Sequence, residues 1–173
     1  QRKAIEINPN YAEAYCNLGG ILNDLSQPNE AEVLIRKSIK INPNFAMSYS
    51  NLGNILNDLG RIKEAELSTR KAIELNPDLD EANWNLSHIL LKQKRFEEGW
   101  NKFSFRWKVK KTSIEIGGRL ITTKPEWSPE KNGRVLLWAE QGPGDQLLFL
   151  TLIPDLIDKV NKLIITVDKR LVP

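Results

Sequence analysis

Three asparagines recur at one fixed spacing, and their side chains are the first candidates for chemistry. Asn17, Asn51 and Asn85 are separated from one another by steps of 34 residues. A carboxamide both donates and accepts hydrogen bonds, so a row of such groups can pair with the peptide units of an extended polypeptide, with little regard to its sequence. The alternative is structural, because the same groups can hydrogen-bond neighbouring parts of the chain or water. The spacing therefore predicts either a peptide-binding row or an internal hydrogen-bond network.

A glycine-rich turn is the second candidate. Gly142 and Gly144 lie in the segment 140–145, directly before a predicted helix. Free backbone N–H groups at such a turn can hold an anion or a substrate, although two glycines also serve simply to make the turn. The segment lacks the Gly-Lys-Ser/Thr of a nucleotide-binding loop and the third glycine of the dinucleotide fingerprint. Asp145 itself suits the N-terminal cap of the following helix.

Composition excludes several kinds of site. Among 173 residues the chain has one cysteine, Cys16, and one histidine, His88. It therefore lacks the residues for an internal disulfide framework or a four-cysteine zinc site, and we predict neither a metal nor a cofactor in it. No apolar run approaches the roughly 20 residues of a membrane span, and no signal peptide is visible. We expect a cytoplasmic chain that does not contact a membrane.

The charge is small and uneven. The formal net charge of +3 divides into −2 over residues 1–99 and +5 over residues 100–173. An excess of this size argues against nucleic acid as a partner. The basic stretch 102–111 leaves RNA binding open as an alternative.

A period of 34 residues organises the elements that must position the asparagines. Asn-Pro pairs begin at positions 8, 42 and 76. In the first complete unit, residues 11–25 carry an apolar stripe of helical period, residues 26–29 are predicted to form a turn, and residues 30–41 a second helix that ends before Pro43. Gly60 suits a left-handed helix end in the second copy. Because one helical pair cannot bury its apolar face alone, neighbouring units are expected to stack.

The repeated unit resembles the tetratricopeptide repeat. The second copy matches best, at Tyr49, Asn51, Leu52, Gly53, Ala65, Ala72 and Pro77. The third copy drifts, with Asn83, Ser87 and Gly99 at motif positions. The resemblance covers roughly residues 1–107 and implies a mainly α fold, a superhelix of about three helix-turn-helix repeats. Small residues are expected to let the paired helices approach closely, at Ala31, Ala65 and Ala72.

The resemblance implies an interaction scaffold. The first helices of tetratricopeptide repeats line a concave groove, and in the repeats of protein O-GlcNAc transferases asparagines at the matching position grip peptide backbone. It therefore implies that Asn17, Asn51 and Asn85 bind a protein or peptide ligand in the groove.

The end of the predicted array is rich in aromatic side chains, namely Phe96, Trp100, Phe103, Phe105 and Trp107. We expect them to form core at the junction with the next domain, with a ligand-stacking surface as the alternative. Cys16 occupies a variable repeat position, which favours a buried thiol over a nucleophile. His88 has no cysteine or histidine partner nearby, and we assign it no chemistry.

The hydrophobic period changes in the last third of the chain. A connector at 108–132 holds a predicted β-hairpin around Gly117-Gly118. Residues 134–139 and 162–167 have the apolar character of buried parallel strands, and a helix is predicted over 146–160, kinked or restarted near Pro154. This order makes 133–173 a small, incomplete α/β (βαβ) segment.

This last segment resembles the start of a GT-B glycosyltransferase domain of the heptosyltransferase type, which bacterial proteins join to tetratricopeptide repeats. The resemblance is carried by 96–107, Pro125, Trp127 and 136–146. It implies that Gly144-Asp145 opens the first helix at the acceptor side, with Asp145 as the catalytic base. The half that would bind a nucleotide-sugar does not follow in the sequence. We therefore expect a piece of a longer chain that does not transfer sugar by itself and that can form a homodimer through its exposed α/β segment.

Overall fold

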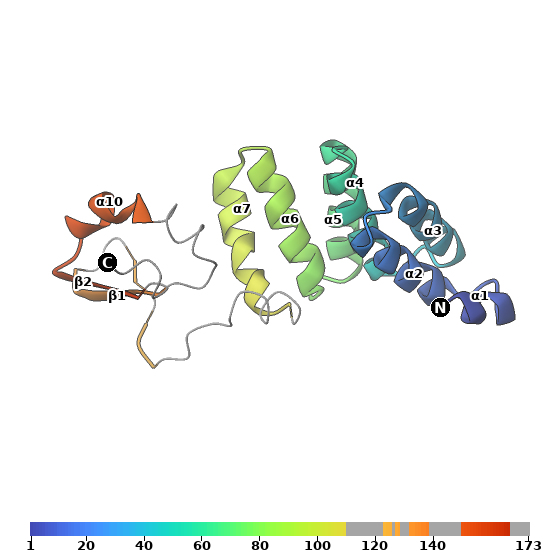
Figure 1. Cartoon of the computed structure of the whole chain (residues 1–173), viewed down its shortest axis with the longest axis horizontal. Coiled ribbons are helices and arrows are strands. Elements are labelled where there is room, and N and C mark those ends of the chain that lie inside the picture. The colour runs from blue at the N-terminus through green and yellow to red at the C-terminus, as the bar shows by residue number, and fades with distance from the viewer. Residues whose placement is uncertain (110–122, 126, 129–131, 139–149, 167–173) are drawn as a thin grey trace. The chain divides into compact units, whose positions relative to one another are not determined.

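The computed structural model describes residues 1–109, 123–125, 127–128, 132–138 and 150–166 (Figure 1). The chain divides into two compact units, residues 1–109 and 110–173. Each unit is described by itself.

The N-terminal unit is a row of helical hairpins (Figure 1). Its elements are α1 (Arg2–Ile7), α2 (Ala12–Asp24), α3 (Pro28–Ile41), α4 (Ala46–Asp58), α5 (Ile62–Leu75), α6 (Asp80–Lys92), α7 (Phe96–Phe103) and the 3₁₀ helix η1 (Ser104–Trp107). The pairs α2/α3, α4/α5 and α6/α7 are successive copies of one hairpin, which confirms the predicted stack of about three repeats. The second helix of the first pair begins earlier than predicted, at Pro28, because proline suits the first turn of a helix.

The turn inside each hairpin uses a left-handed residue, as predicted at Gly60. Its φ is 76°, and the same position in the other two copies is occupied by Ser26 and Lys94, with φ of 60° and 61°. The following backbone N–H closes the turn; that of Arg61, for example, donates to the Leu56 carbonyl over 2.8 Å. This is the helix ending for which glycine is usual. Serine and lysine adopt it here without glycine's freedom, so the residue type indicated the left-handed conformation only at Gly60, although a turn was also predicted at 26–29.

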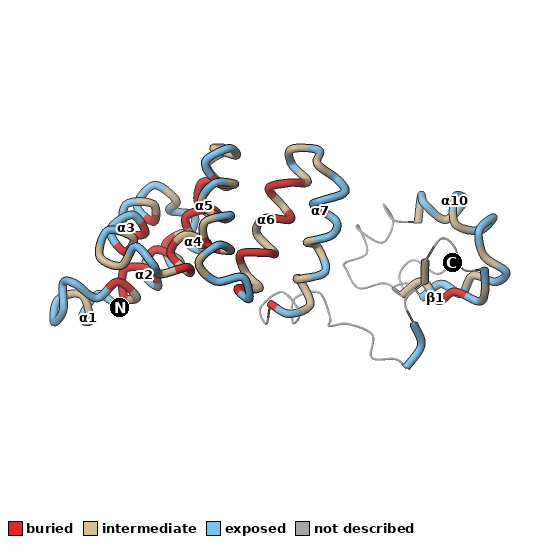
Figure 2. Tube along the Cα trace, turned by 180° about the vertical axis from the view of Figure 1, so that it is seen from behind, coloured by how far each residue is buried: buried red, intermediate tan, exposed pale blue. Residues whose placement is uncertain are grey.

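Small residues bring the two helices of a hairpin together, as predicted. Ala31, Ala65 and Ala72 are fully buried. A Cβ added to Gly19 would lie 2.7 Å from Cδ1 of Ile35, and one added to Gly53 would overlap Oγ1 of Thr69. Buried residues lie along α2, α4, α5 and α6 in Figure 2. The core is therefore continuous through neighbouring hairpins, with Ile35, Ile55, Leu56 and Ile89 among its members.

The third repeat departs from the other two at a buried position. Asn83 stands where the earlier copies have tyrosine, and it is only 1% exposed. Its Nδ2 donates to the carbonyls of Pro77 and Leu79, each over 3.2 Å, and its Oδ1 accepts from Nζ of Lys102 over 2.7 Å. A buried carboxamide is tolerated when its hydrogen bonds are made. The replacement of tyrosine by Asn83 in the third repeat is therefore stabilised by these hydrogen bonds.

The second unit contains a parallel pair of strands. β1 (Arg134–Trp138) pairs with β2 (Lys162–Thr166), with Val135 opposite Leu163. The helix α10 (Ile153–Ile157) lies between them in sequence and has Pro154 in its first turn. The parallel pairing was predicted. The helix was predicted over 146–160, kinked or restarted near Pro154; α10 starts at Ile153, next to this proline, but it ends at Ile157, earlier than predicted. The predicted hairpin around Gly117-Gly118 lies outside the described residues.

None of the helices in the described part of the chain has the length and apolar character needed to cross a bilayer.

Candidate peptide-binding face

The three candidate asparagines lie on the first helices of three successive hairpins. Asn17 is on α2, Asn51 on α4 and Asn85 on α6. Asn17 is exposed, and the other two are half-buried. We call the surface formed by α2, α4 and α6 the first-helix face. Because each hairpin repeats the last, the stacking places one carboxamide per repeat along this face.

Two of the three carboxamides are tied to the preceding repeat. Nδ2 of Asn51 donates to Sγ of Cys16 over 3.3 Å. In the next step, Nδ2 of Asn85 donates to Oγ of Ser50 over 3.2 Å. Both bonds join a residue to the one 35 positions earlier, so they are copies of one contact between neighbouring first helices. This is the internal role that the spacing alone left open.

The acceptor side of these groups is unused. Among the described residues, none donates a hydrogen bond to Oδ1 of Asn17, Asn51 or Asn85. A carboxamide oxygen can take two hydrogen bonds. The row therefore has three oxygens without a donor among the described residues, and the interhelical bonds hold two of these carboxamides, those of Asn51 and Asn85. Backbone N–H groups of an extended segment are suitable donors for them.

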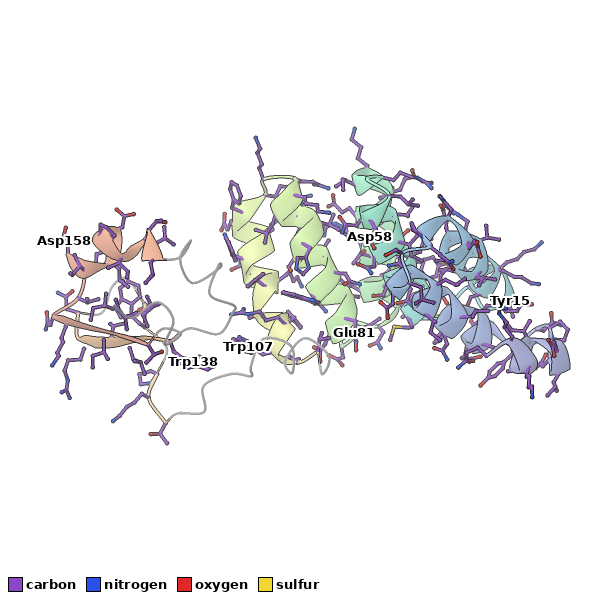
Figure 3. The ribbon with its side chains drawn as sticks, in the orientation of Figure 1. Tyr15, Asp58, Glu81, Trp107, Trp138 and Asp158 are labelled. Atoms are coloured by element: carbon purple, nitrogen blue, oxygen red, sulfur yellow. The ribbon has the colours of Figure 1, made fainter. Side chains whose placement is uncertain are left out.

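A second row of polar contacts lies about two turns further along the same helices. Nδ2 of Asn23 donates to Oδ2 of Asp58 over 2.9 Å, and Nζ of Lys92 donates to Oδ1 of Asn57 over 2.9 Å. Figure 3 labels Asp58 at the end of α4. These bonds also span 35 positions. Sequence reasoning missed this row, although Asp24, Asp58 and Lys92 occupy equivalent repeat positions and their change of charge was a visible signal.

A pocket opens between α4 and α6. Its volume is about 270 Å³, and it is lined by Asn54, Asn57, Asn85, His88, Ile89 and Lys92. It therefore joins one residue of the predicted row, Asn85, to residues that the sequence did not single out for binding. Carboxamides, an imidazole and an ammonium make it a polar pocket.

His88 lines this pocket and packs against an aromatic ring. Its ring meets that of Trp84 edge-on, with the centroids 4.1 Å apart. Burial lowers the pKa of His88, because the charged imidazolium is poorly solvated there; a hydrogen bond to the Trp84 backbone opposes this shift and Lys92 adds to it. His88 is therefore a neutral wall of the pocket at neutral pH.

The remaining predicted features fall in different places. Cys16 is fully buried, which confirms the predicted buried thiol, and burial raises the pKa of this thiol. Within the aromatic set, Phe103 packs on Trp84 and Trp100, with centroids 5.1 and 4.8 Å apart. Phe96 and Trp100 are each more than half exposed on the N-terminal unit. Their predicted role at a domain junction stays a prediction.

The glycine-rich turn lies outside the described residues, and so do its members Gly142, Gly144 and Asp145. Their predicted roles in anion binding and base catalysis stay predictions. In the part of the chain that the structure describes, no three metal-ligating side chains gather in one place.

Comparison with known proteins identifies the helical unit. Family profiles described as tetratricopeptide repeat match residues 46–79 and 2–33. A solved structure, described as the crystal structure of MamA, has a TM-score of 0.54 and 21% identity, and the alignment covers 64% of this chain and 64% of the MamA chain. This likeness concerns the fold. No curated protein matches the chain. Residues 2–33 and 46–79 of this chain therefore match tetratricopeptide repeats, and the N-terminal unit has the fold of a stack of such repeats.

Proposed function

We propose that the chain is an interaction scaffold whose first-helix face binds an extended segment of a partner protein. The observation that carries the proposal is the row of carboxamide oxygens at Asn17, Asn51 and Asn85, which accept no hydrogen bond from the described residues. Tetratricopeptide repeats in general mediate protein–protein interaction, and the matches at 2–33 and 46–79 support this class of function.

The row suits backbone recognition better than side-chain recognition. One acceptor per repeat can take backbone N–H groups at regular intervals along an extended segment. Each net hydrogen bond of this kind contributes about 0.5–1.5 kcal/mol. Several in a row therefore bind measurably without requiring a particular side chain, and specificity must come from other pockets on the same face.

The test is a triple substitution, Asn17→Ala, Asn51→Ala and Asn85→Ala. Peptides are first selected on the wild-type chain from a phage-displayed library of random 12-residue sequences, and the affinity of the best ones is measured by fluorescence anisotropy. We expect the triple variant to bind them at least about tenfold more weakly, because up to three net hydrogen bonds are lost. Circular dichroism checks that the variant is folded, since the Asn51 and Asn85 side chains also join neighbouring helices.

A matched control places the same chemical change away from this face. Asn29, Asn44 and Asn101 are exposed, and none lies on α2, α4 or α6. Their triple alanine variant should keep the wild-type affinity. If the Asn17/Asn51/Asn85 variant also keeps it, the carboxamide row does not bind the peptide and the proposal fails in this form.

We also propose that the array serves a glycosyltransferase-like protein in the cytoplasm, with Asp145 near the reaction centre. The order β1, α10, β2 and the parallel pairing of the strands support it, because a Rossmann-like half begins in this way. Exposed apolar residues on this unit, such as Leu136 and Ile164, support the further proposal of a homodimer. The first proposal is tested by titrating nucleotide-sugars into a longer protein that contains this chain and measuring their binding. The second is tested by measuring the molar mass of the chain by light scattering.

A further inference from the structure

The equivalent position at the end of the first helices carries a charge that changes sign along the array. It is Asp24 in α2, Asp58 in α4 and Lys92 in α6. In the step from α2 to α4, the carboxylate of Asp58 accepts from Asn23. In the step from α4 to α6, the ammonium of Lys92 donates to Asn57 instead. The two steps are thus the same contact with the polarity of its hydrogen bond reversed.

The reversal coincides with the pocket between α4 and α6. Of the described residues that line this pocket of about 270 Å³, Lys92 is a cation and none is a carboxylate. Lys92 is exposed, and one of its three N–H groups is used by Asn57. Nδ2 of Asn54 and Nδ2 of Asn57 donate to none of the described residues. The pocket therefore offers donors around one positive charge.

From this arrangement we infer that the pocket binds the carboxylate of an aspartate or glutamate side chain of the bound segment, with Lys92 as its counter-ion. The inference rests on the proposed function, because it names a side chain of the same extended partner. A carboxylate is an acceptor-only group with room for about four hydrogen bonds, which matches donors on Lys92, Asn54 and Asn57. The equivalent position of the two earlier repeats carries a carboxylate, Asp24 or Asp58, whereas Lys92 lines the pocket, so the positive charge favours an acidic residue at this pocket.

The chain itself suggests a variant that should fold. In Lys92→Asp the third repeat receives the residue that the first and second repeats already have at this position. The Asn57 carboxamide can then turn and donate to the new carboxylate, as Asn23 donates to Asp58. The variant reverses the charge at the pocket and keeps an interhelical hydrogen bond. A second variant, Lys92→Gln, removes the charge alone.

The control is Lys63→Asp. Lys63 is exposed on α5, a second helix, and does not line the pocket. It changes the net charge of the chain by the same amount as Lys92→Asp. Long-range attraction of an acidic peptide would therefore weaken equally in both variants, whereas a specific counter-ion would be lost in only one.

The experiment uses the full chain and a phage-displayed library of random 12-residue peptides. We expect peptides selected on the wild type to share an acidic residue at one position, and its Glu→Gln exchange to weaken binding about tenfold, as loss of a charge-assisted hydrogen bond would. With Lys92→Gln the two peptides should bind alike, with Lys92→Asp the Gln peptide should bind better, and with Lys63→Asp the Glu preference should remain.

The outcomes separate this inference from the proposed function. If the selected peptides bind the wild type and show no acidic preference, or if the preference survives in Lys92→Gln, the carboxylate pocket is overturned and the binding face stands. If the library yields no binding peptide, both are overturned.

Discussion

Arg61 joins the second repeat to the first through Glu32. Its Nη1 donates to both carboxylate oxygens of Glu32, over 2.8 and 2.9 Å, while its Nε and Nη2 donate to Glu64 on α5, the helix that starts directly after Arg61. The next step repeats the arrangement, since Arg95 donates to Glu66 over 2.6 Å and to Glu98. The arginine after each hairpin turn therefore lies between two acids from neighbouring second helices, and a charged ladder follows the stack of repeats.

We expect the Arg61–Glu32 pair to couple the stability of the two repeats. A double-mutant cycle with Arg61→Met and Glu32→Gln should give a favourable coupling energy that shrinks when the ionic strength is raised, because the pair is only partly buried and salt therefore still screens it. The measurement is urea unfolding at low and high salt. The control cycle uses Lys71 and Glu74, which pair within α5 and join no repeats. A coupling energy no larger than that of the control pair would show that the Arg61–Glu32 ion pair does not couple the stability of the two repeats.

Gly53 is required by the close approach of α4 to α5. A Cβ there would overlap Oγ1 of Thr69 and lie 3.2 Å from the Ala65 carbonyl oxygen, so Gly53→Ala should destabilise the unit by about 1–3 kcal/mol through overpacking. Gly20 is the matched control, because its added Cβ would meet Nδ2 of Asn51 at an ordinary 3.6 Å. Gly20→Ala should stabilise α2 by about 0.5–1 kcal/mol. Thermal unfolding followed by circular dichroism shows whether each variant is less or more stable than the wild type. Equal changes in stability for Gly53→Ala and Gly20→Ala would contradict the close packing at Gly53.

Ile55 and Ile21 occupy one repeat position in different surroundings. Ile55 is fully buried, whereas Ile21 is 48% exposed. Ile55→Ala should therefore cost about 2–5 kcal/mol of unfolding free energy, because it leaves a cavity in the core. Ile21→Ala should cost clearly less, since much of its side chain is already in water. Chemical denaturation of both variants measures the difference, and similar losses would mean that the face of α2 bearing Ile21 is covered in solution.

Acidification should lower the unfolding free energy of the N-terminal unit in two separate pH ranges, one for His88 and one for Glu32. Burial lowers the pKa of His88 below its ordinary value of about 6.5, so the unfolded chain binds this proton more readily and the unfolding free energy falls as the pH drops below about 6.5. Partial burial raises the pKa of Glu32, but hydrogen bonds from Arg36 and Arg61 together outweigh it and the pKa is lowered. Its contribution is therefore lost only when the pH falls below about 4.5.

Urea unfolding between about pH 8 and pH 3 checks both ranges. His88→Asn introduces the residue that the second repeat has at this position, Asn54. This variant should lose the pH dependence near neutrality and keep the dependence at acidic pH. A variant that follows the wild type through both ranges would show that His88 titrates alike in the folded and unfolded chain.

Much of the fold could be predicted from local patterns. The period of 34 residues, the apolar stripes and the Asn-Pro pairs located the helical hairpins, because a helix and its end depend on near neighbours in the chain. Gly60 indicated its left-handed turn for the same reason, and the two apolar runs around Pro154 indicated a parallel strand pair. A turn was also predicted at 26–29, but the left-handed conformation of Ser26 and Lys94 was not, since neither residue favours a positive φ by itself.

The candidate site depended on the stacking of repeats. The sequence determined that Asn17, Asn51 and Asn85 are equivalent. Only the tertiary structure decided that Asn51 and Asn85 each donate to a residue 35 positions earlier, on the first helix of the preceding repeat. The pocket at His88 and Lys92 also exists only because α4 and α6 lie side by side. Identical residues such as Ile21 and Ile55 likewise differ in burial. The physical reason is that a repeated sequence determines each helix and its apolar face, whereas burial and hydrogen-bond partners are determined by the neighbour that packs against that face.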